Sequence, residues 1–149
     1  MKRLIALTAI AGLLLSGCGA TTTKALTVKW MTEADQDKSY NSLHADISKT
    51  VKYLRASSST QADLHTLCSV LNLEIHAAND YLPTPDTQAT DLLANGYDTL
   101  ATATTQCDQA STNPAKRTAA IENFRQGFAD LYFGMERLYR VLGRTGTPR

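Results

Sequence analysis

The chain has 149 residues, of which 43% are hydrophobic and 19% charged, and its 15 basic and 14 acidic residues give a net charge of +1 at pH 7. A nucleic-acid-binding domain needs a strongly basic face, so this balance argues against nucleic acid as a partner. The length and the hydrophobic content suffice for one domain with a buried core.

The first seventeen residues carry the features of an export signal. Lys2 and Arg3 give a positive start, and residues 4–15 form an apolar run that is too short to anchor the chain across a bilayer. We therefore expect residues 1–17 to be a cleaved signal peptide. A plain signal peptide with an Ala-x-Ala cleavage site is the alternative, but it leaves the cysteine at position 18 unexplained.

The segment Leu15-Ser16-Gly17-Cys18 resembles the lipobox of bacterial lipoproteins, in which an aliphatic residue and two small residues precede an obligatory cysteine. The resemblance implies that the Cys18 thiol receives a diacylglyceryl group, that cleavage occurs before Cys18, and that the lipid holds the protein on the exported side of a membrane. Two or three acyl chains suffice for stable attachment. Gly19 is not the aspartate that retains lipoproteins in the inner membrane of many Gram-negative species. The address is therefore the outer membrane in a Gram-negative source, and otherwise the outer face of the cell membrane.

The two remaining cysteines are Cys68 and Cys107. An even pair in an exported protein predicts a disulfide. This bond would close a loop of about 39 residues and stabilise the fold by on the order of 3–4 kcal/mol. Two free buried thiols, or half of a metal site that includes His65, are the alternatives.

Residues 18–37 are predicted to hold the lipidated cysteine and a tether. The small and polar residues 19–23 suit a flexible linker, whereas residues 24–37 fit no single pattern. Trp30 either packs on one end of the domain or lies at the membrane interface, where indole rings partition well.

Residues 38–143 show apolar residues at intervals of three and four, which is typical of amphipathic helices. Four successive stripes follow this spacing: Tyr40, Leu43, Ile47, Val51 and Leu54; Leu64, Leu67, Leu71, Ile75, Ala78 and Leu82; Leu93, Gly96, Leu100, Ala103 and Cys107; and Ile121, Phe124, Phe128, Leu131, Met135, Leu138 and Leu142.

Helix start and stop signals separate these stripes. Serines 57–59 interrupt the first helix, and Thr60 with an acid three residues later resembles the capping pair of the second. The segment 82–86 ends the second helix and starts the third, with Thr84 as N-cap and Pro85 as first helical residue. Asn113 and the proline after it start the fourth helix, which ends at Gly143.

Four helices with short loops predict an all-α, up-down-up-down four-helix bundle over residues 38–143, followed by a tail at residues 144–149. In this bundle Cys107 is about seven residues further from the connecting turn than Cys68, or roughly 10 Å along the axis. A disulfide therefore requires the turn to run along the bundle. Cys68, the turn at residues 82–86 and Cys107 also resemble small exported helical domains of actinobacteria, from which no function is carried over.

The fourth helix has a second stripe at intervals of seven, formed by Ala120, Gly127, Gly134 and Val141. Two glycines inside a helix cost about 2 kcal/mol relative to alanine. One explanation is the close approach of a neighbouring helix. The other is a groove, flanked by Tyr132, Phe133 and Tyr139, that accepts a partner helix or an apolar ligand.

Catalytic and metal-binding motifs are absent from the sequence. The chain lacks Gly-x-Ser-x-Gly, His-Glu-x-x-His, the paired Glu-x-x-His of di-iron bundles and a glycine-rich phosphate loop. We therefore expect no catalytic residue, no metal and no cofactor. The basic residues Arg137, Arg140 and Arg144 complement the dipole of the last helix, and they also suit anionic headgroups or an acidic partner.

These features together predict a lipid-anchored protein of the cell envelope that acts as a non-catalytic interaction or scaffold module, with an envelope protein as partner. The alternative is a lipoprotein that holds a small apolar ligand or a metal between helices. The apolar ligand requires a cavity lined by Tyr97, Phe124 and Phe128, and the metal requires His65 close to a second histidine.

Overall fold

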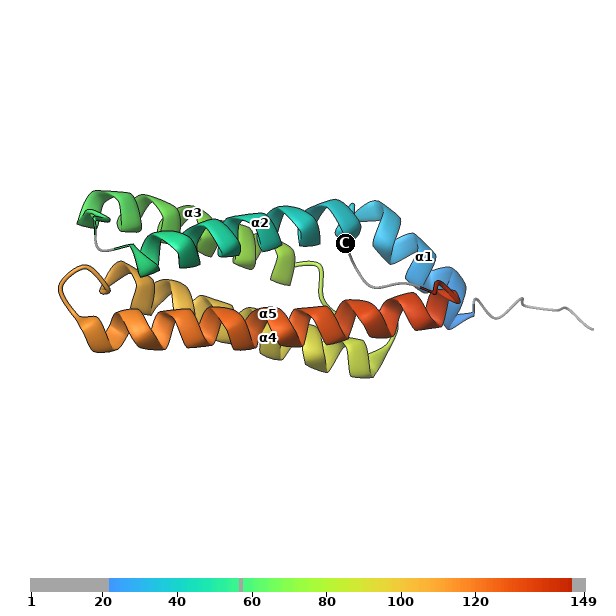
Figure 1. Ribbon diagram of the computed structural model, residues 1–149. Helices are drawn as coiled ribbons and strands as arrows, with labels where there is room; N and C mark the ends of the chain where they lie inside the picture. The colour runs from blue at the N-terminus through green and yellow to red at the C-terminus, as the bar shows by residue number, and fades with distance from the viewer. Residues whose placement is uncertain (1–21, 57, 146–149) are drawn as a thin grey trace, which may run out of the picture.

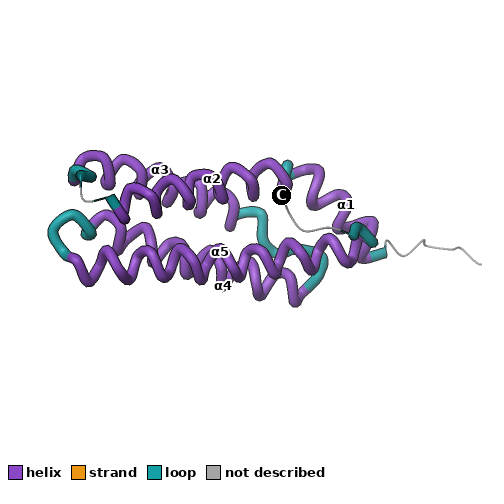
Figure 2. Tube along the Cα trace, in the orientation of Figure 1, coloured by secondary structure: helices purple, strands orange, loops and turns teal. Residues whose placement is uncertain are grey.

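The computed structural model describes residues 22–56 and 58–145. The predicted signal peptide, Cys18 and residues 146–149 lie outside the described residues. Five helices follow one another, and the described residues contain no strand (Figure 1 and Figure 2). They are α1 (Thr23–Glu33), α2 (Gln36–Arg55), α3 (Gln61–Asn79), α4 (Thr87–Asp108) and α5 (Pro114–Leu142). The all-helical class is confirmed. The prediction of four helices is wrong, because α1 precedes the four that the sequence pattern indicates.

Helix α1 lies within the segment 18–37 that was predicted to be a tether. The Thr22 side chain caps this helix by accepting a hydrogen bond from the backbone N–H of Ala25 at 3.2 Å. Only Thr27 and Met31 of α1 are buried. The buried Thr27 is polar, and its hydroxyl donates to the carbonyl of Thr23 inside the helix. A helix with so narrow a buried stripe shows no apolar period in the sequence.

The chain turns sharply between α1 and α2 at Asp35. This residue has a φ of 44°, in the left-handed region that non-glycine residues adopt infrequently. Figure 1 shows α1 leaving the direction of α2 at this point and crossing obliquely toward the C-terminal end of α5. The turn at Asp35 thus separates α1 from α2, and α1 covers one end of the bundle.

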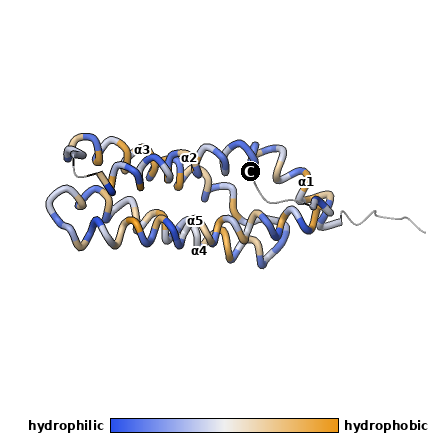
Figure 3. Tube along the Cα trace, viewed as in Figure 1, coloured by the Kyte–Doolittle hydropathy of each residue, from blue (hydrophilic) through white to orange (hydrophobic). Residues whose placement is uncertain are grey.

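The other four helices form two antiparallel pairs, with α2 and α3 in one layer and α4 and α5 in the other (Figure 1). Apolar and polar residues alternate along each helix, as Figure 3 shows, because each helix has a buried side and an exposed side. The interior is formed mainly by large aliphatic and aromatic side chains that are almost fully buried: Leu54, Leu64, Leu71, Ile75, Leu93, Leu100, Phe124, Leu131, Met135 and Leu138.

Most of the predicted helix boundaries coincide with capping interactions. Thr60 and Asp63 form a reciprocal capping box at the start of α3, and their hydrogen bonds lower the pKa of the Asp63 carboxyl. The Asn113 side chain accepts hydrogen bonds from two backbone N–H groups at the start of α5. Gly143 ends α5 with a φ of 72°, which glycine adopts at little cost.

The start of α4 differs from the prediction. Its N-cap is Asp86, whose side chain accepts from the backbone N–H of Ala89 at 2.9 Å, and the helix begins at Thr87 instead of Pro85. Thr84 stabilises the preceding turn, since its hydroxyl donates to the carbonyl of Asp86 at 2.7 Å. Asp86 also pairs with Arg137 of α5, which helps to hold its carboxylate in place.

The segment between α3 and α4 runs along the bundle instead of turning back at once. Helix α3 already ends at Asn79, earlier than its apolar stripe suggests, and α4 begins at Thr87. Figure 1 shows this segment leading from the end of α3 toward the α1 end of the molecule. This segment shifts the start of α4 along the bundle axis relative to the end of α3, as a bond between Cys68 and Cys107 requires.

Candidate functional site

Cys68 of α3 and Cys107 of α4 form a disulfide, with their Cα atoms 5.9 Å apart. Both side chains are buried in the interior of the bundle. The bond joins two helices from different layers. The predicted pairing is therefore confirmed, and neither cysteine is a free thiol that would hold a metal.

Gly127 and Gly134, two of the residues predicted to line a groove, are buried where α5 packs on α4. A Cβ atom on Gly127 would lie 2.9 Å from the backbone oxygen of Gly96, and one on Gly96 would lie 3.0 Å from the oxygen of Gly127. The two glycines thus allow two helix backbones to cross in contact. These positions face the neighbouring helix and do not form an open groove, which favours the packing explanation of the glycine stripe.

The aromatic residues expected beside that groove, Tyr132, Phe133 and Tyr139, lie in different environments. Tyr139 donates a hydrogen bond from its hydroxyl to Asp37 at 2.6 Å. Burial, together with the hydrogen bond and charge of Asp37, raises the pKa of Tyr139 to about 12. Phe133 remains half exposed, and Tyr132 packs edge-on against it with ring centroids 5.6 Å apart. Of the three, only Phe133 presents a large apolar surface to solvent.

The arginines at the end of α5 are paired with acids. The guanidinium of Arg137 donates two hydrogen bonds at 3.2 Å and one at 3.0 Å to the carboxylate of Asp86. This pairing is the main reason why the pKa of Asp86 is lowered. Arg140 pairs with Glu136 at 2.8 Å, and Arg144 pairs with Asp37 at 3.3 Å. The predicted basic end is therefore largely neutralised by its own acids.

The outer side of α3 carries a second apolar stripe that the sequence interpretation missed. We call it the α3 outer face and define it by Val70, Leu73, Ala77 and Tyr81, which all lie on the solvent side. Leu73 is 71% exposed, Tyr81 51% and Val70 49%. Their spacing of three, four and four residues places them on one side of the helix, turned away from the buried Leu71. Helix α3 is thus apolar on two sides.

A signal for this face was present in the sequence. The buried stripe of α3 accounts for Leu64, Leu71 and Ile75, and it leaves Val70 and Leu73 without a place in the core. Two apolar residues outside a helix's apolar seam indicate a second contact surface or a buried helix. Their exposure in the structure excludes the second explanation.

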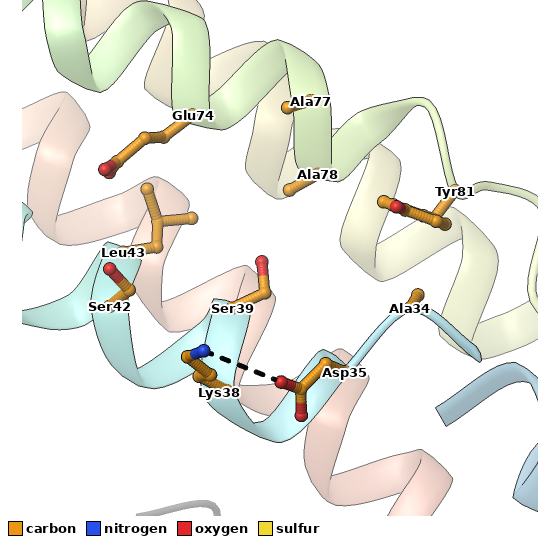
Figure 4. Close-up of a pocket in the computed structure, with 10 residues that line it drawn as sticks. All are labelled: Ala34, Asp35, Lys38, Ser39, Ser42, Leu43, Glu74, Ala77, Ala78 and Tyr81. Carbon is orange, nitrogen blue, oxygen red and sulfur yellow. Dashed lines mark ion pairs between the residues drawn. The ribbon is translucent and has the colours of Figure 1, made fainter. Parts of the chain in front are cut away.

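A hollow of about 330 Å³ adjoins the α3 outer face, where α2 and α3 meet next to the break at Asp35. Figure 4 shows Glu74 at one end of the hollow and Tyr81 at the other. The small side chains of Ala77 and Ser39 lie between them. Such a depression accepts a side chain of a partner or a small ligand.

Glu74 is the chemically distinctive residue of this hollow. Its Oε2 atom is buried and makes no hydrogen bond with the described residues. Burial of the carboxyl and the nearby charge of Asp46 both raise the pKa of Glu74. A buried carboxylate oxygen without a hydrogen-bond donor is unfavourable, and a donor or a cation brought by a binding partner would offset part of that cost.

The residues predicted to bind an apolar ligand or a metal between the helices are packed against other side chains or paired with them. Phe124 and Tyr97 belong to the core, and Phe128 stacks on Tyr40 and His44 with ring centroids 5.4 Å and 4.4 Å apart. His65 pairs with Asp108. Among residues 22–145, apart from residue 57, no group of three or more His, Cys, Asp or Glu side chains is arranged to hold a metal ion. None of the helices in this same part is long and apolar enough to cross a membrane.

Comparison of the chain with protein-family models, with curated proteins and with solved structures finds no match. The class that the structure itself defines is an all-helical protein of five helices in its described residues.

Proposed function

We propose that this protein is a lipid-anchored module of the cell envelope that binds a partner protein through the α3 outer face. The lipobox-like segment that ends at Cys18 supports the anchor. The observation that carries the binding function is the continuous apolar stripe on α3, whose central residue, Leu73, is 71% exposed. Exposed apolar surface of this kind marks interaction sites in soluble domains.

The shape of the stripe favours a protein partner. Val70 and Ala77 are seven residues apart, or about 10 Å along α3, and Tyr81 extends the stripe past the end of the helix. The surface of a single helix is convex, so an apolar molecule cannot be enclosed by it, whereas a partner helix can lie along it. The hollow beside Ala77 and a smaller one of about 160 Å³ beside Val70 provide depressions for the partner's side chains.

Site-specific photo-cross-linking in intact cells tests the binding function. A photoreactive residue at Leu73 is expected to give a discrete cross-linked product, and one at Gln126, on the exposed side of α5, is expected to give none. The substitution Val70→Gln should reduce the product at position 73 without changing stability, because Val70 is half exposed. Equal products at positions 73 and 126 would refute the proposed surface, and a product of twice the chain's mass would identify the partner as a second copy.

Mass spectrometry of the membrane fraction tests the anchor. The mature chain is expected to begin at Cys18 and to carry the added mass of acyl chains, whereas the Cys18→Ala variant should lack this mass. Unmodified Cys18 in the wild-type protein would refute lipid anchoring, because cleavage and acylation at this cysteine are what the lipobox resemblance implies.

A second candidate function is the binding of a small ligand in the hollow of about 330 Å³, a volume at the lower end for ligand sites. The buried and unpartnered Oε2 atom of Glu74 favours it. A ligand that donates a hydrogen bond or carries a positive charge there should raise the melting temperature of the wild-type protein and not that of Glu74→Gln. Glu136→Gln, which alters a carboxylate paired with Arg140, is the matched control.

A further inference from the structure

We propose that the bundle stands end-on on the membrane, with the α1 end against the phospholipid headgroups. We define the α1 end as residues 22–29 of α1 together with residues 140–144 at the C-terminus of α5. The inference rests on the proposed function, because it requires acyl chains on Cys18, and it adds the orientation of the domain and the surface that meets the lipid.

The length of chain between the lipid and the fold limits the distance between them. Three residues separate Cys18 from Thr22, the N-cap of α1. Even a fully extended chain covers at most about 3.6 Å per residue, so Thr22 lies within about 14 Å of the acylated cysteine. The first turn of α1 is therefore kept next to the headgroups.

Helix α1 cannot act as a loose extension of this tether, because it is fixed to the rest of the domain. The indole Nε1–H of Trp30 donates to the backbone carbonyl of Tyr81 at 2.7 Å. Thr27 and Met31 are buried beneath the helix. On the neighbouring side, the hydroxyl of Tyr139 joins the end of α5 to Asp37 at the start of α2. A short tether on a fixed helix restrains the whole bundle.

The opposite end of the bundle is far from this attachment point. Helix α5 has 29 residues and is therefore about 43 Å long. Its N-terminus and the C-terminus of α2 lie together at the end away from α1, as Figure 1 shows. Tyr53, near the end of α2 and 38% exposed, marks that distant end.

The side chains exposed on α1 suit a headgroup layer. Leu26 is 41% exposed and Val28 49%, and both can enter the layer where indole and aliphatic groups partition. Lys24 has no ion-pair partner among the described residues, and its long chain lets the ammonium reach phosphate groups. Residues 22–32 contain no acid that would repel them.

Charge attraction is a minor part of this contact. Lys29 is paired with Glu33, and the α5 arginines at this end are paired as described above. Lys24 is thus the main free cation that the described residues offer the membrane here. The contact should form on zwitterionic phosphatidylcholine as well as on anionic phosphatidylglycerol, and it should depend little on salt.

The chain contains a single tryptophan, Trp30, which allows a direct test. Lipidated protein is purified from membranes and reconstituted into phosphatidylcholine vesicles that include a lipid with a nitroxide quencher on its headgroup. Acylation of Cys18 is verified by mass spectrometry in the same preparation. The nitroxide is expected to reduce the emission of Trp30 several-fold, and adding phosphatidylglycerol should leave this reduction unchanged.

The matched control moves the fluorophore to the distant end with Trp30→Phe and Tyr53→Trp in one chain, and its emission should be nearly unaffected by the nitroxide. If this double variant does not fold, Tyr53→Trp alone serves, because its second tryptophan lies far from the quencher and the fraction of quenched emission should fall below that of the wild type.

Equal quenching at positions 30 and 53 would show that the bundle lies flat and would overturn the inference. Absence of quenching at both positions would also overturn it, because the domain would then be held away from the lipid. Both results leave the lipid anchor intact, whereas protein that lacks acyl chains on Cys18 contradicts the proposed function itself.

Discussion

Replacing Gly127 with alanine tests the close crossing of α4 and α5 on which the bundle depends. The new Cβ atom would lie 2.8 Å from Cγ of Leu100 and 2.9 Å from the backbone oxygen of Gly96. Optimal carbon–carbon contacts are about 3.5–4.0 Å, so Cγ of Leu100 has to move by more than half an ångström. The contact of 2.9 Å with the oxygen of Gly96 is also too short, so this atom has to move as well. The leucine can change its rotamer, but the oxygen belongs to the backbone of α4 and moves only if the helices separate.

The expected magnitude is a balance of two effects. Alanine is favoured over glycine inside a helix by about 1 kcal/mol. Inserting a methyl group into a tightly packed contact costs about 1–3 kcal/mol. Because the backbone has to move here, the upper part of that range applies, and Gly127→Ala should lower the free energy of unfolding by about 1–2 kcal/mol. The melting temperature should fall by about 3–6 °C for a domain of this size.

Urea unfolding followed by far-ultraviolet circular dichroism, with the disulfide intact, measures this loss. Gly134→Ala is the matched control, because its Cβ atom would meet the side chain of Leu93 at 2.7 Å while the nearest backbone oxygen, that of Ala89, is 3.4 Å away. It should be less destabilised than Gly127→Ala. A Gly127→Ala variant as stable as the wild type, or more stable than Gly134→Ala, would refute the backbone-contact argument.

Four further changes probe the electrostatics and the covalent link. Replacing Cys68 and Cys107 with alanine should lower the free energy of unfolding by about 3–4 kcal/mol, because the bond closes a loop across 39 positions, and calorimetry measures the change. Asp86→Asn keeps a helix cap but loses the ion pair, whereas Asp86→Ala should cost about 1 kcal/mol more in urea unfolding. The ion-pair contribution is expected above about pH 4, and it should be lost as pH falls through the lowered pKa of Asp86. Glu74→Gln should raise the melting temperature at pH 7, because the pKa of Glu74 is raised and the folded state therefore disfavours its charged carboxylate. This gain should vanish below about pH 4, where Glu74 is neutral in both the folded and the unfolded chain. Burial raises the pKa of Tyr97 to about 12, so the Tyr97 hydroxyl loses its proton at a lower pH in the unfolded chain than in the folded one. The free energy of unfolding should therefore fall as pH rises above about 10, and Tyr97→Phe should lessen that fall.

Helices α2 to α5 were predictable because each has a wide apolar stripe and recognisable caps. The capping box of Thr60 and Asp63 and the Asn113 cap are local interactions, so they depend only on nearby sequence. Helix α1 was not predicted because its buried residues include the polar Thr27, whose hydroxyl donates a hydrogen bond to a carbonyl within the helix. The pairing of the Asp86 cap with Arg137 was also not predicted, because the two residues are fifty-one positions apart in the sequence.

The candidate surface was less predictable than the fold. The sequence pattern offered Gly127 and Gly134 as a groove or as a helix contact, and only the spatial position of Gly96 on α4 distinguishes the two. Val70 and Leu73 were apolar residues outside the seam, but a sequence does not show whether a second seam is covered by another helix. Lipid attachment at Cys18 remains a prediction, because this residue lies outside the described residues.

A helix that is apolar on two sides raises the question of what decides which side is buried. If α3 rotated by half a turn about its axis, Leu73 would enter the core, but Leu64 and Ile75 would become exposed, so hydrophobic burial already opposes the rotation. Cys68 lies on the buried side, and its bond to Cys107 of α4 excludes the rotated form. The disulfide therefore adds a covalent restraint to the rotation of α3 that apolar burial already favours. In the variant without the two cysteines, hydrogen exchange should accelerate in α3 more than in α2 under conditions where the domain is still folded. Equal acceleration in both helices would show that packing alone determines the rotation of α3.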